Sequence, residues 1–330
     1  MPQPTLSDVH VNIALTNLSV AFRQDEATFV ADKVFPIVPV DQQSNVYFTY
    51  TRGDWNRNTM KKRAPGTESA GTGFGLDKTG TYSADIWSLH HDIPDAIRAN
   101  ADAVLNMDAD ATRFLIQQAL ITKEVNWATT FFATSVWTTQ WAGQAASPGA
   151  NQFLQWNDPS STPIEDIRGV KQLVQVAGGG FRPNVLVLGR PVFDKLCDHP
   201  DLIDRVKYGQ TPGQPAMAAR EAMAQIFELD EVLVMDAVYN TAAEGATESN
   251  SFIGGKSALL AYRSKAPGIM TPSAGYTFAW TGLYGATEIG NRIKSFYMPW
   301  IESTRVEIDD AYALTKIGAD LGGFFATAVA

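Results

Sequence analysis

The spacing of apolar and polar residues predicts a long β-hairpin arm in the N-terminal part of the chain. Residues 45–51 alternate between two faces, one of which carries Val46, Phe48 and Tyr50. A period of two with β-branched and aromatic side chains is typical of a strand. Residues 81–89 form a second strand candidate, and the glycine-rich stretch 53–80 separates the two. Connections of this length are usually functional or disordered, so we expect the arm to lie on another surface.

The longest helix is predicted over residues 108–134. Asp108 marks its start, and Asp110 lies in the first turn, where the helix dipole favours acidic residues. Its apolar residues fall on two stripes, whereas a helix on a single core needs one. We therefore expect a helix wedged between two surfaces. The first stripe contains Phe114, Ile121, Val125, Ala128 and Phe132, and the second contains Ile116, Leu120, Trp127 and Phe131.

The pattern changes after Trp156, where residues 157–163 are typical of a linker that ends in a helix start. Residues 164–177 have helical spacing, and Gly178–Gly180 end that helix because glycine tolerates the left-handed conformation. The apolar run 185–188 is typical of a buried strand. We expect an α/β lobe that begins near this linker. Further strands are predicted at residues 231–238, 257–262, 276–281, 292–297 and 304–308.

Composition narrows the classes of protein. Charged residues make up 18% of the 330 residues, below the ~25% of ordinary globular proteins, and aromatic residues make up 11%. This balance excludes disorder, and the length favours two domains. The net charge of −9 argues against a broad basic surface for nucleic acid.

Targeting and redox signals point to a soluble protein made in cytoplasm-like conditions. Cys197 is the only cysteine, so no intrachain disulfide is possible. The first residues lack the features of a signal peptide. No apolar run approaches the ~20 residues that span a bilayer, and we expect no membrane contact.

The charges of the arm are sorted along the chain. Basic residues dominate 50–63, and acidic residues dominate 66–95. One interpretation is a set of solvated loop charges, since exposed pairs contribute little. The other is that the two charged limbs fix register against a partner surface. For the run Lys61-Lys62-Arg63, a protein contact or a solvated arm is favoured over a nucleic-acid contact, because three basic residues in an acidic chain give a weak field.

No catalytic, cofactor-binding or metal-binding residue is predicted. Residues 254–257 resemble the end of a phosphate-binding loop, but the first glycine of that motif would fall at Asn250, and a strand follows. In His90-His91-Asp92, neighbouring imidazoles on a strand point to opposite faces. Cys197 next to Asp198 and His199 lacks a sequence signal for a low thiol pKa.

The order of these parts resembles the major capsid proteins of tailed bacteriophages, whose Hong Kong 97-type fold is shared with encapsulin shells. The segments that carry the resemblance are Phe29–Val40, Tyr47–Tyr50, Gly53–Trp55, and Arg98–Asp102 leading into the long helix. The resemblance implies an α+β fold with an N-terminal arm, an extended β-hairpin loop, a long spine helix, a peripheral domain and an α/β axial domain. The implied boundaries are 1–40 for the arm, 41–89 for the extended loop, 90–162 for the peripheral domain with its spine helix at 108–134, 163–267 for the axial domain, and 268–330 for strands that return to the peripheral domain and a C-terminal segment.

The resemblance also implies a function and partners. The chain would assemble with copies of itself into hexamers and pentamers of an icosahedral virion shell around double-stranded DNA, with DNA nearby but not specifically bound. It would be made in the host cytoplasm, with a separate scaffolding protein, a portal and a decoration protein as partners. Some relatives cross-link a loop lysine to a neighbour's asparagine, and Lys61, Lys62 and Lys78 lie in the loop.

Apolar and basic side chains that an isolated subunit could not bury or pair are our candidates for contacts between subunits. They are Trp55, Arg57, Lys61, Lys62, Arg63, Phe74, Trp87, Ile116, Leu120, Trp127 and Phe131. Two other classes stay open: an encapsulin-type compartment that encloses protein cargo, and an α/β enzyme with a β-rich appendage. Stable interfaces are poor in charge and rich in aromatic residues at their centres, which agrees with the composition of a shell subunit.

Overall fold

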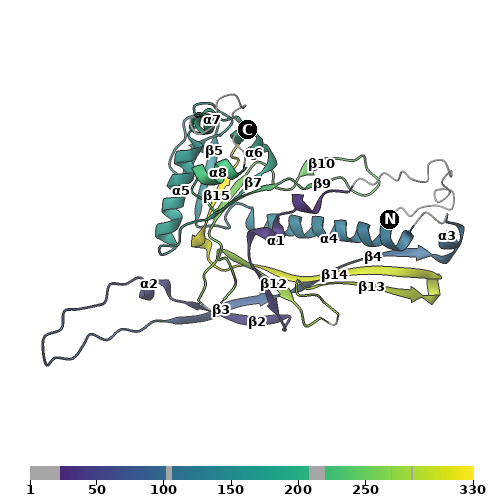
Figure 1. Cartoon of the computed structure of the whole chain (residues 1–330), viewed down its shortest axis with the longest axis horizontal. Coiled ribbons are helices and arrows are strands. Elements are labelled where there is room, and N and C mark those ends of the chain that lie inside the picture. Colours follow the sequence, from purple (N-terminus) through teal and green to yellow (C-terminus); the bar gives the residue numbers. More distant parts are fainter. Residues whose placement is uncertain (1–22, 102–105, 208–219, 269, 284) are drawn as a thin grey trace.

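The computed structural model describes residues 23–101, 106–207, 220–268, 270–283 and 285–330. Residues 1–22 of the expected N-terminal arm lie outside the described residues. The described chain is mixed α and β and elongated (Figure 1). It contains a compact lobe around a six-stranded sheet, a long five-stranded sheet, and the arm.

The compact lobe is a mixed sheet covered by helices. Its strand order is β6-β5-β15-β11-β7-β8, with β11 antiparallel to both of its neighbours. The strands are β5 (Thr139–Gln144), β6 (Gln152–Leu154), β7 (Val185–Gly189), β8 (Glu231–Met235), β11 (Ala258–Ala261) and β15 (Gly322–Ala326). The helices are α5 (Pro163–Ala177), α6 (Arg190–Cys197), α7 (Pro200–Lys207) and α8 (Arg220–Ile226), and a small hairpin joins β9 (Val238–Asn240) to β10 (Asn250–Phe252).

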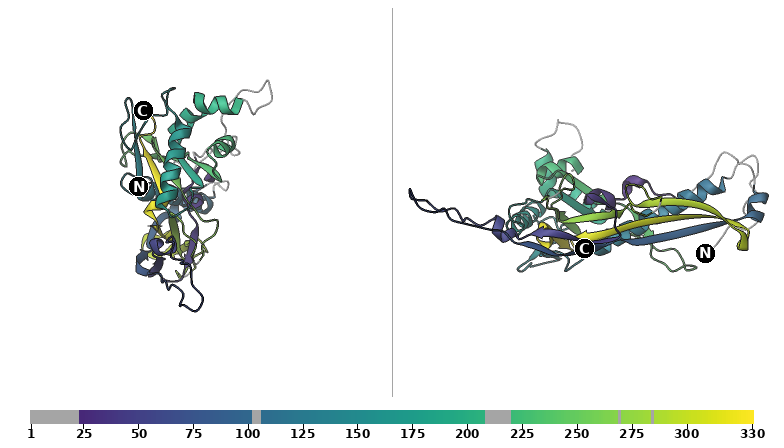
Figure 2. Two further views of the ribbon diagram at one scale, coloured as in Figure 1. Left: turned by 90° about the vertical axis from the view of Figure 1, so that its left-hand side faces the viewer. Right: turned by 90° about the horizontal axis from the view of Figure 1, so that it is seen from below.

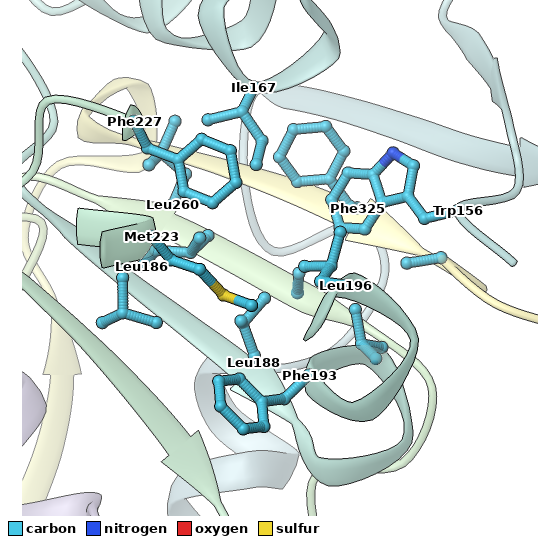
Figure 3. Close-up of a cluster of buried hydrophobic side chains, with 14 of the residues drawn as sticks. Trp156, Ile167, Leu186, Leu188, Phe193, Leu196, Met223, Phe227, Leu260 and Phe325 are labelled. Atoms are coloured by element: carbon cyan, nitrogen blue, oxygen red, sulfur yellow. The ribbon is translucent and has the colours of Figure 1, made fainter. Parts of the chain in front are cut away.

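The apolar run in β7 is buried on both faces. Leu186 and Leu188 point into the core under α5, α6 and α8 (Figure 3), while Val185 and Val187 belong to a second core on the opposite face. Alternate residues of a strand point to opposite sides, so a sheet covered on both faces needs a continuous apolar run. The buried strand predicted at 185–188 is therefore confirmed.

The six-stranded sheet extends across the boundary that we expected near residue 163. Strands β5 and β6 precede that position, and β15 comes from the C-terminal segment. The Trp156 ring lies 5.1 Å from the Phe325 ring and is fully buried in the same core as α5. Residues on either side of the linker thus share one core, and the linker does not separate two sheets.

The long sheet is organised around one strand, β14 (Ser303–Lys316). The first part of β14 pairs with β13 and the last part with β12, while β4 pairs along its other edge. β1 pairs in parallel with β12 at the border of the sheet. The bounds are β1 (Ile37–Val40), β4 (Asp85–Pro94), β12 (Gly275–Trp280) and β13 (Asn291–Met298), with short helical turns at η2 (Glu26–Thr28), α1 (Ala31–Val34), α3 (Asp95–Asn100), η3 (Pro299–Ile301) and η4 (Ala319–Leu321).

The long helix α4 (Met107–Phe131) lies along this sheet and contacts two cores. Near its start, Leu115 packs against Val306 and Ile308 of β14. Near its end, Trp127 and Phe131 are fully buried in the second core of the compact lobe. Because these two rings have no exposed surface, our expectation that they contact another subunit is wrong.

The arm consists of β2 (Ser44–Tyr50) paired antiparallel with β3 (Leu76–Ser83). Its second limb differs from the strand predicted at 81–89, because the chain breaks at the buried Ala84 and residues 85–94 join β14 instead. The glycine-rich sequence gave no signal for the start of β3 at Leu76. The Tyr47 ring packs directly against Gly80, where a Cβ atom would lie 2.4 Å from the ring.

Candidate assembly surface

Exposed apolar side chains gather on the arm. Trp55 is 53% exposed and Phe74 is 62% exposed. Monomeric proteins rarely expose large contiguous apolar patches, so this part of the chain is suited to contact another molecule. The remaining members are Val46, Phe48, Tyr50, Met60 and Leu76.

Three rings form a cluster at the neck of the arm, where α2 (Arg52–Trp55) follows β2. The ring centroids of Tyr50, Trp55 and Phe74 are 5.6 to 5.9 Å apart. The backbone of Gly75 donates to Oδ2 of Asp54 at 3.0 Å and so closes the neck. The two limbs are therefore joined here, and the aromatic cluster is preorganised.

Beyond the neck, residues 57–73 form the tip of the arm, which carries the predicted basic residues. Arg57 lies 3.7 Å from Asp54, and Arg63 donates to the carbonyl of Thr67. The structure records no ion pair to Lys61 or Lys62 from any residue that it describes. The predicted basic residues thus lie at the tip. Arg57 and Arg63 have partners within the described chain, whereas Lys61 and Lys62 have no ion pair there.

Residues 85–94 of the predicted acidic limb belong to the long sheet and not to the arm. Asp92 belongs to β4, where it receives two hydrogen bonds from Arg305 at 2.7 and 2.9 Å. Trp87 is also in β4, and its ring stacks on Tyr312 of the long sheet rather than on the neck cluster. The sequence pattern therefore placed residues of two different sheets on one arm.

The last two candidate residues lie along α4. Ile116 packs against the core of the long sheet. Leu120 lines a pocket of about 390 Å³ together with Phe29 and Ala31 of the N-terminal segment. Both side chains thus have contacts within the subunit. Because they are partly exposed, their outer atoms stay candidates for contacts between subunits.

A second exposed apolar surface lies at the opposite end of the molecule, where β13 turns into β14 (Figure 2). Trp300 in η3 is 85% exposed, and Ile301 and Tyr297 are about half exposed. We did not predict this surface. The signal was present in the sequence as an apolar run, Tyr297–Ile301, interrupted by a proline.

Buried charges hold the long sheet in register. Asp309 is 2% exposed and receives Ser88 Oγ at 2.5 Å, Arg292 Nε at 2.6 Å and Lys294 Nζ at 2.9 Å. Burial by itself would raise the pKa of Asp309, but these hydrogen bonds outweigh it and lower the pKa to about 2. The cluster joins β4, β13 and β14 behind the exposed end of the sheet.

The N-terminal segment is fastened to α4 by charged groups. Glu124 is fully buried and accepts the backbone N–H groups of Val30 at 3.0 Å and Ala31 at 2.8 Å. Beside it, Lys123 Nζ lies 2.8 Å from Asp32. Burial raises the pKa of Glu124 to about 7, although the two backbone hydrogen bonds act against that rise.

The side chains considered for chemistry have structural partners. His199 and Ser161 are buried and hydrogen-bonded at 2.9 Å, and burial raises the pKa of the Cys197 thiol. Gly254 and Gly255 lie against the backbone of Gly189, where a Cβ atom would be 2.1 Å from the Gly255 oxygen. The described residues hold no cluster of three metal-ligating side chains.

Comparison with known proteins identifies the fold. Residues 154–274 match the family of phage major capsid protein E. The major capsid protein of Pseudomonas phage JBD67 is 26% identical over 317 residues, which cover 96% of each chain. A phage-related protein from Bordetella bronchiseptica RB50 superposes with a TM-score of 0.66 at 21% identity, over 92% of this chain and 93% of that chain.

Two assembled shells have the same fold. The capsid of cyanophage P-SCSP1u gives a TM-score of 0.60 at 10% identity, covering 98% of this chain and 95% of that chain. The SrpI encapsulin of Synechococcus elongatus PCC 7942 gives 0.56 at 9% identity, covering 96% and 95%. The chain therefore has the Hong Kong 97-type capsid fold, and its sequence is similar to those of phage major capsid proteins.

Proposed function

We propose that this chain is the structural major capsid protein of a tailed phage, which assembles with copies of itself into the shell of the virion. The observation that carries the proposal is the similarity to a phage major capsid protein over 96% of the chain. The exposed aromatic residues of the arm agree with it, because a free subunit leaves them in water.

The fold alone does not separate a phage capsid from an encapsulin, since both share it. The sequence relatives favour the phage capsid, because the homologues found by sequence are phage major capsid proteins. The content of the shell distinguishes the two functions, with DNA expected inside a capsid and a cargo protein inside an encapsulin.

No helix in the described part of the chain has the length and apolar character to cross a bilayer.

The domain roles are part of this proposal. The helices and sheet of the compact lobe would form the axial domain, with β5, β6 and β15 added to the range 163–267. The long sheet and α4 would form the peripheral domain, and β2, β3 and the tip would form the loop that overlaps a neighbour. Hexamers, pentamers, a scaffolding protein, a portal and a decoration protein rest on the resemblance to the capsid family.

Deletion of the arm tip tests the proposal. The full chain should form closed shells visible by negative-stain electron microscopy. Replacing residues 57–73 by a short Gly-Ser linker should leave the subunit folded, because the tip contributes nothing to the cores, and should abolish closed shells. A matched control shortens the exposed loop 242–248 between β9 and β10. Normal shells from the tip deletion would contradict the role of the arm.

A full-length chain that stays a monomer or a small oligomer under all assembly conditions would contradict the capsid function itself. Shells purified from infected cells should contain DNA. A protein cargo in place of DNA would assign the chain to the encapsulin class instead.

A further inference from the structure

The neck of the arm lies on the C-terminal end of α5. One guanidinium nitrogen of Arg52 donates to the carbonyl of Ala177 at 2.6 Å, and Nδ2 of Asn56 donates to the carbonyl of Gly179 at 3.3 Å. The last carbonyls of a helix have no partner within the helix and carry partial negative charge. A cation and an amide of the arm therefore complete the end of a helix in the compact lobe.

A carboxylate of the compact lobe holds the same arginine. Oδ2 of Asp320 lies 2.9 Å from the Arg52 nitrogen, while Oδ1 receives the hydroxyl of Thr138 at 2.6 Å. Thr138 directly precedes β5, and Asp320 lies in η4 just before β15. The orientation of the Asp320 carboxylate is thus fixed from the side of the sheet, and Arg52 is held between this carboxylate and the helix end.

Gly179 provides the third part of this contact. Its φ is +76°, and a Cβ atom there would lie 2.5 Å from Asn56 Nδ2 and 2.8 Å from Arg52 Cδ. Gly180 has a φ of +100°, but nothing lies within 4 Å of the position of its Cβ atom. Both glycines meet the backbone requirement of the turn, and Gly179 alone of the two also makes room for the arm.

The arm is attached at a second place, its root on the long sheet. The Tyr82 ring stacks on Phe278 of β12 with centroids 4.5 Å apart, and the Tyr47 ring stacks on the same side chain at 6.1 Å. A rod held at one point can rotate about it, whereas a rod held at two points has a fixed direction. Because the root is held on the long sheet, the second contact, with α5, determines the angle at which the arm leaves the subunit.

We propose that Arg52, Asn56, Gly179 and Asp320 form a seat that sets the direction in which the arm leaves the subunit. These are positioning residues, since they act on the arm and not on a neighbouring subunit directly. The inference rests on the proposed function for its consequence, because a preoriented arm loses less freedom when it meets a neighbour. The seat itself is a property of the single subunit and is measured there.

The first experiment measures the direction of the arm in the full-length subunit before assembly. Spin labels are placed at Asn58→Cys, just beyond the seat, and at Glu165→Cys in the first turn of α5, in a Cys197→Ser background. Pulsed electron paramagnetic resonance then gives the distribution of distances between the two spin labels. We expect Gly180→Ala to keep the narrow distribution of the parent and Gly179→Ala to shift or broaden it.

Gly180→Ala is the matched control, because both substitutions place a side chain on a left-handed backbone. A general loss of stability would therefore affect both variants alike. Equal distance distributions for Gly179→Ala and Gly180→Ala would overturn the proposal. Arg52→Ala and Asp320→Ala provide a second route without backbone strain, with Arg52→Lys as the conservative variant that keeps the charge at the helix end.

We expect Arg52→Ala and Asp320→Ala to broaden the distribution and Arg52→Lys to restore part of it. Melting temperatures should change little, because an ion pair this exposed contributes little to the stability of the folded chain. An unchanged distribution in both alanine variants would also overturn the seat. Electron microscopy of the same variants separates the two proposals. If the direction of the arm changes while closed shells still form normally, the capsid function stands. The link between the direction of the arm and assembly is then contradicted.

Discussion

Oε2 of Glu124 in the middle of α4 lies 2.8 Å from the backbone nitrogen of Ala31 at the start of α1. This contact crosses from the N-terminal segment to the longest helix and is shielded from water. It fastens the segment that leads through β1 into the arm. The position and charge of Glu124 therefore affect the stability of the subunit in a pH-dependent way.

Glu124 should make the subunit less stable as the pH rises from about 5 to 8. Its pKa is raised from 4.5 to about 7 in the folded chain, so the folded state holds a proton that the unfolded state has already lost in this range. The effect is on the order of 3 kcal/mol between the two limits. Urea unfolding of the parent and of Glu124→Gln at pH 5 and pH 8 measures it.

The difference in unfolding free energy between parent and Glu124→Gln should fall with rising pH, since the amide does not titrate. A difference that is constant from pH 5 to pH 8 would show that Glu124 keeps its ordinary pKa in the fold. The neighbouring charged groups Lys123, Asp32, Lys33 and Asp310 remain in both proteins, so their own titration largely cancels.

Asp309→Asn should destabilise the subunit by about 3 kcal/mol, because it removes a buried carboxylate that two cations share. The pKa of Asp309 is lowered to about 2, so its contribution is complete above the ordinary value of 3.8 and is lost as the pH falls towards 2. The exposed pair Arg98–Asp108 is the control, with Asp108→Asn expected to cost less than about 1 kcal/mol. Thermal unfolding at pH 7 compares the two, and equal shifts would contradict the buried role.

Two tryptophans should give opposite results. Trp127→Ala should lower the unfolding free energy by about 3–5 kcal/mol, because the ring is fully buried inside the subunit. Trp55→Ala should change it by less than about 0.5 kcal/mol and should reduce the yield of shells, because the ring is half exposed on the arm. Calorimetry and electron microscopy of both variants check this. A stable Trp127→Ala subunit that fails only to assemble would reverse our assignment.

Trp300→Ser should weaken assembly without weakening the subunit. The ring is 85% exposed at the end of the long sheet, where it has no role in a core. An aromatic side chain at the centre of an interface contributes about 2 kcal/mol to the free energy of association. The loss of the Trp300 ring should therefore raise the critical concentration for assembly tenfold or more. Val176→Ser on α5 is an equally exposed apolar control at 83%. Light scattering at several concentrations measures the difference, and similar values for both variants would exclude the end of the sheet from the interface.

Much of the local structure could be predicted from the sequence because it depends on short-range spacing. The buried strand at 185–188, the helix that ends at Gly178–Gly180, and the helix that starts beside Asp108 follow from periodicity and from the residues that begin or end helices. The capsid fold was predicted from the order of these parts together with a few segments of family resemblance, and the structural comparisons confirm it.

The tertiary structure alone decided which apolar residues belong to the subunit and which face outward. Trp55 and Trp127 are the same residue type in aromatic-rich surroundings, yet one lies on the arm and the other in a core. Likewise, the sequence shows that Gly179 ends a helix but not that Arg52 of a distant segment lies on it. Spacing along the chain encodes which side chains share a face, whereas the surface that covers that face is set by contacts between residues far apart in sequence.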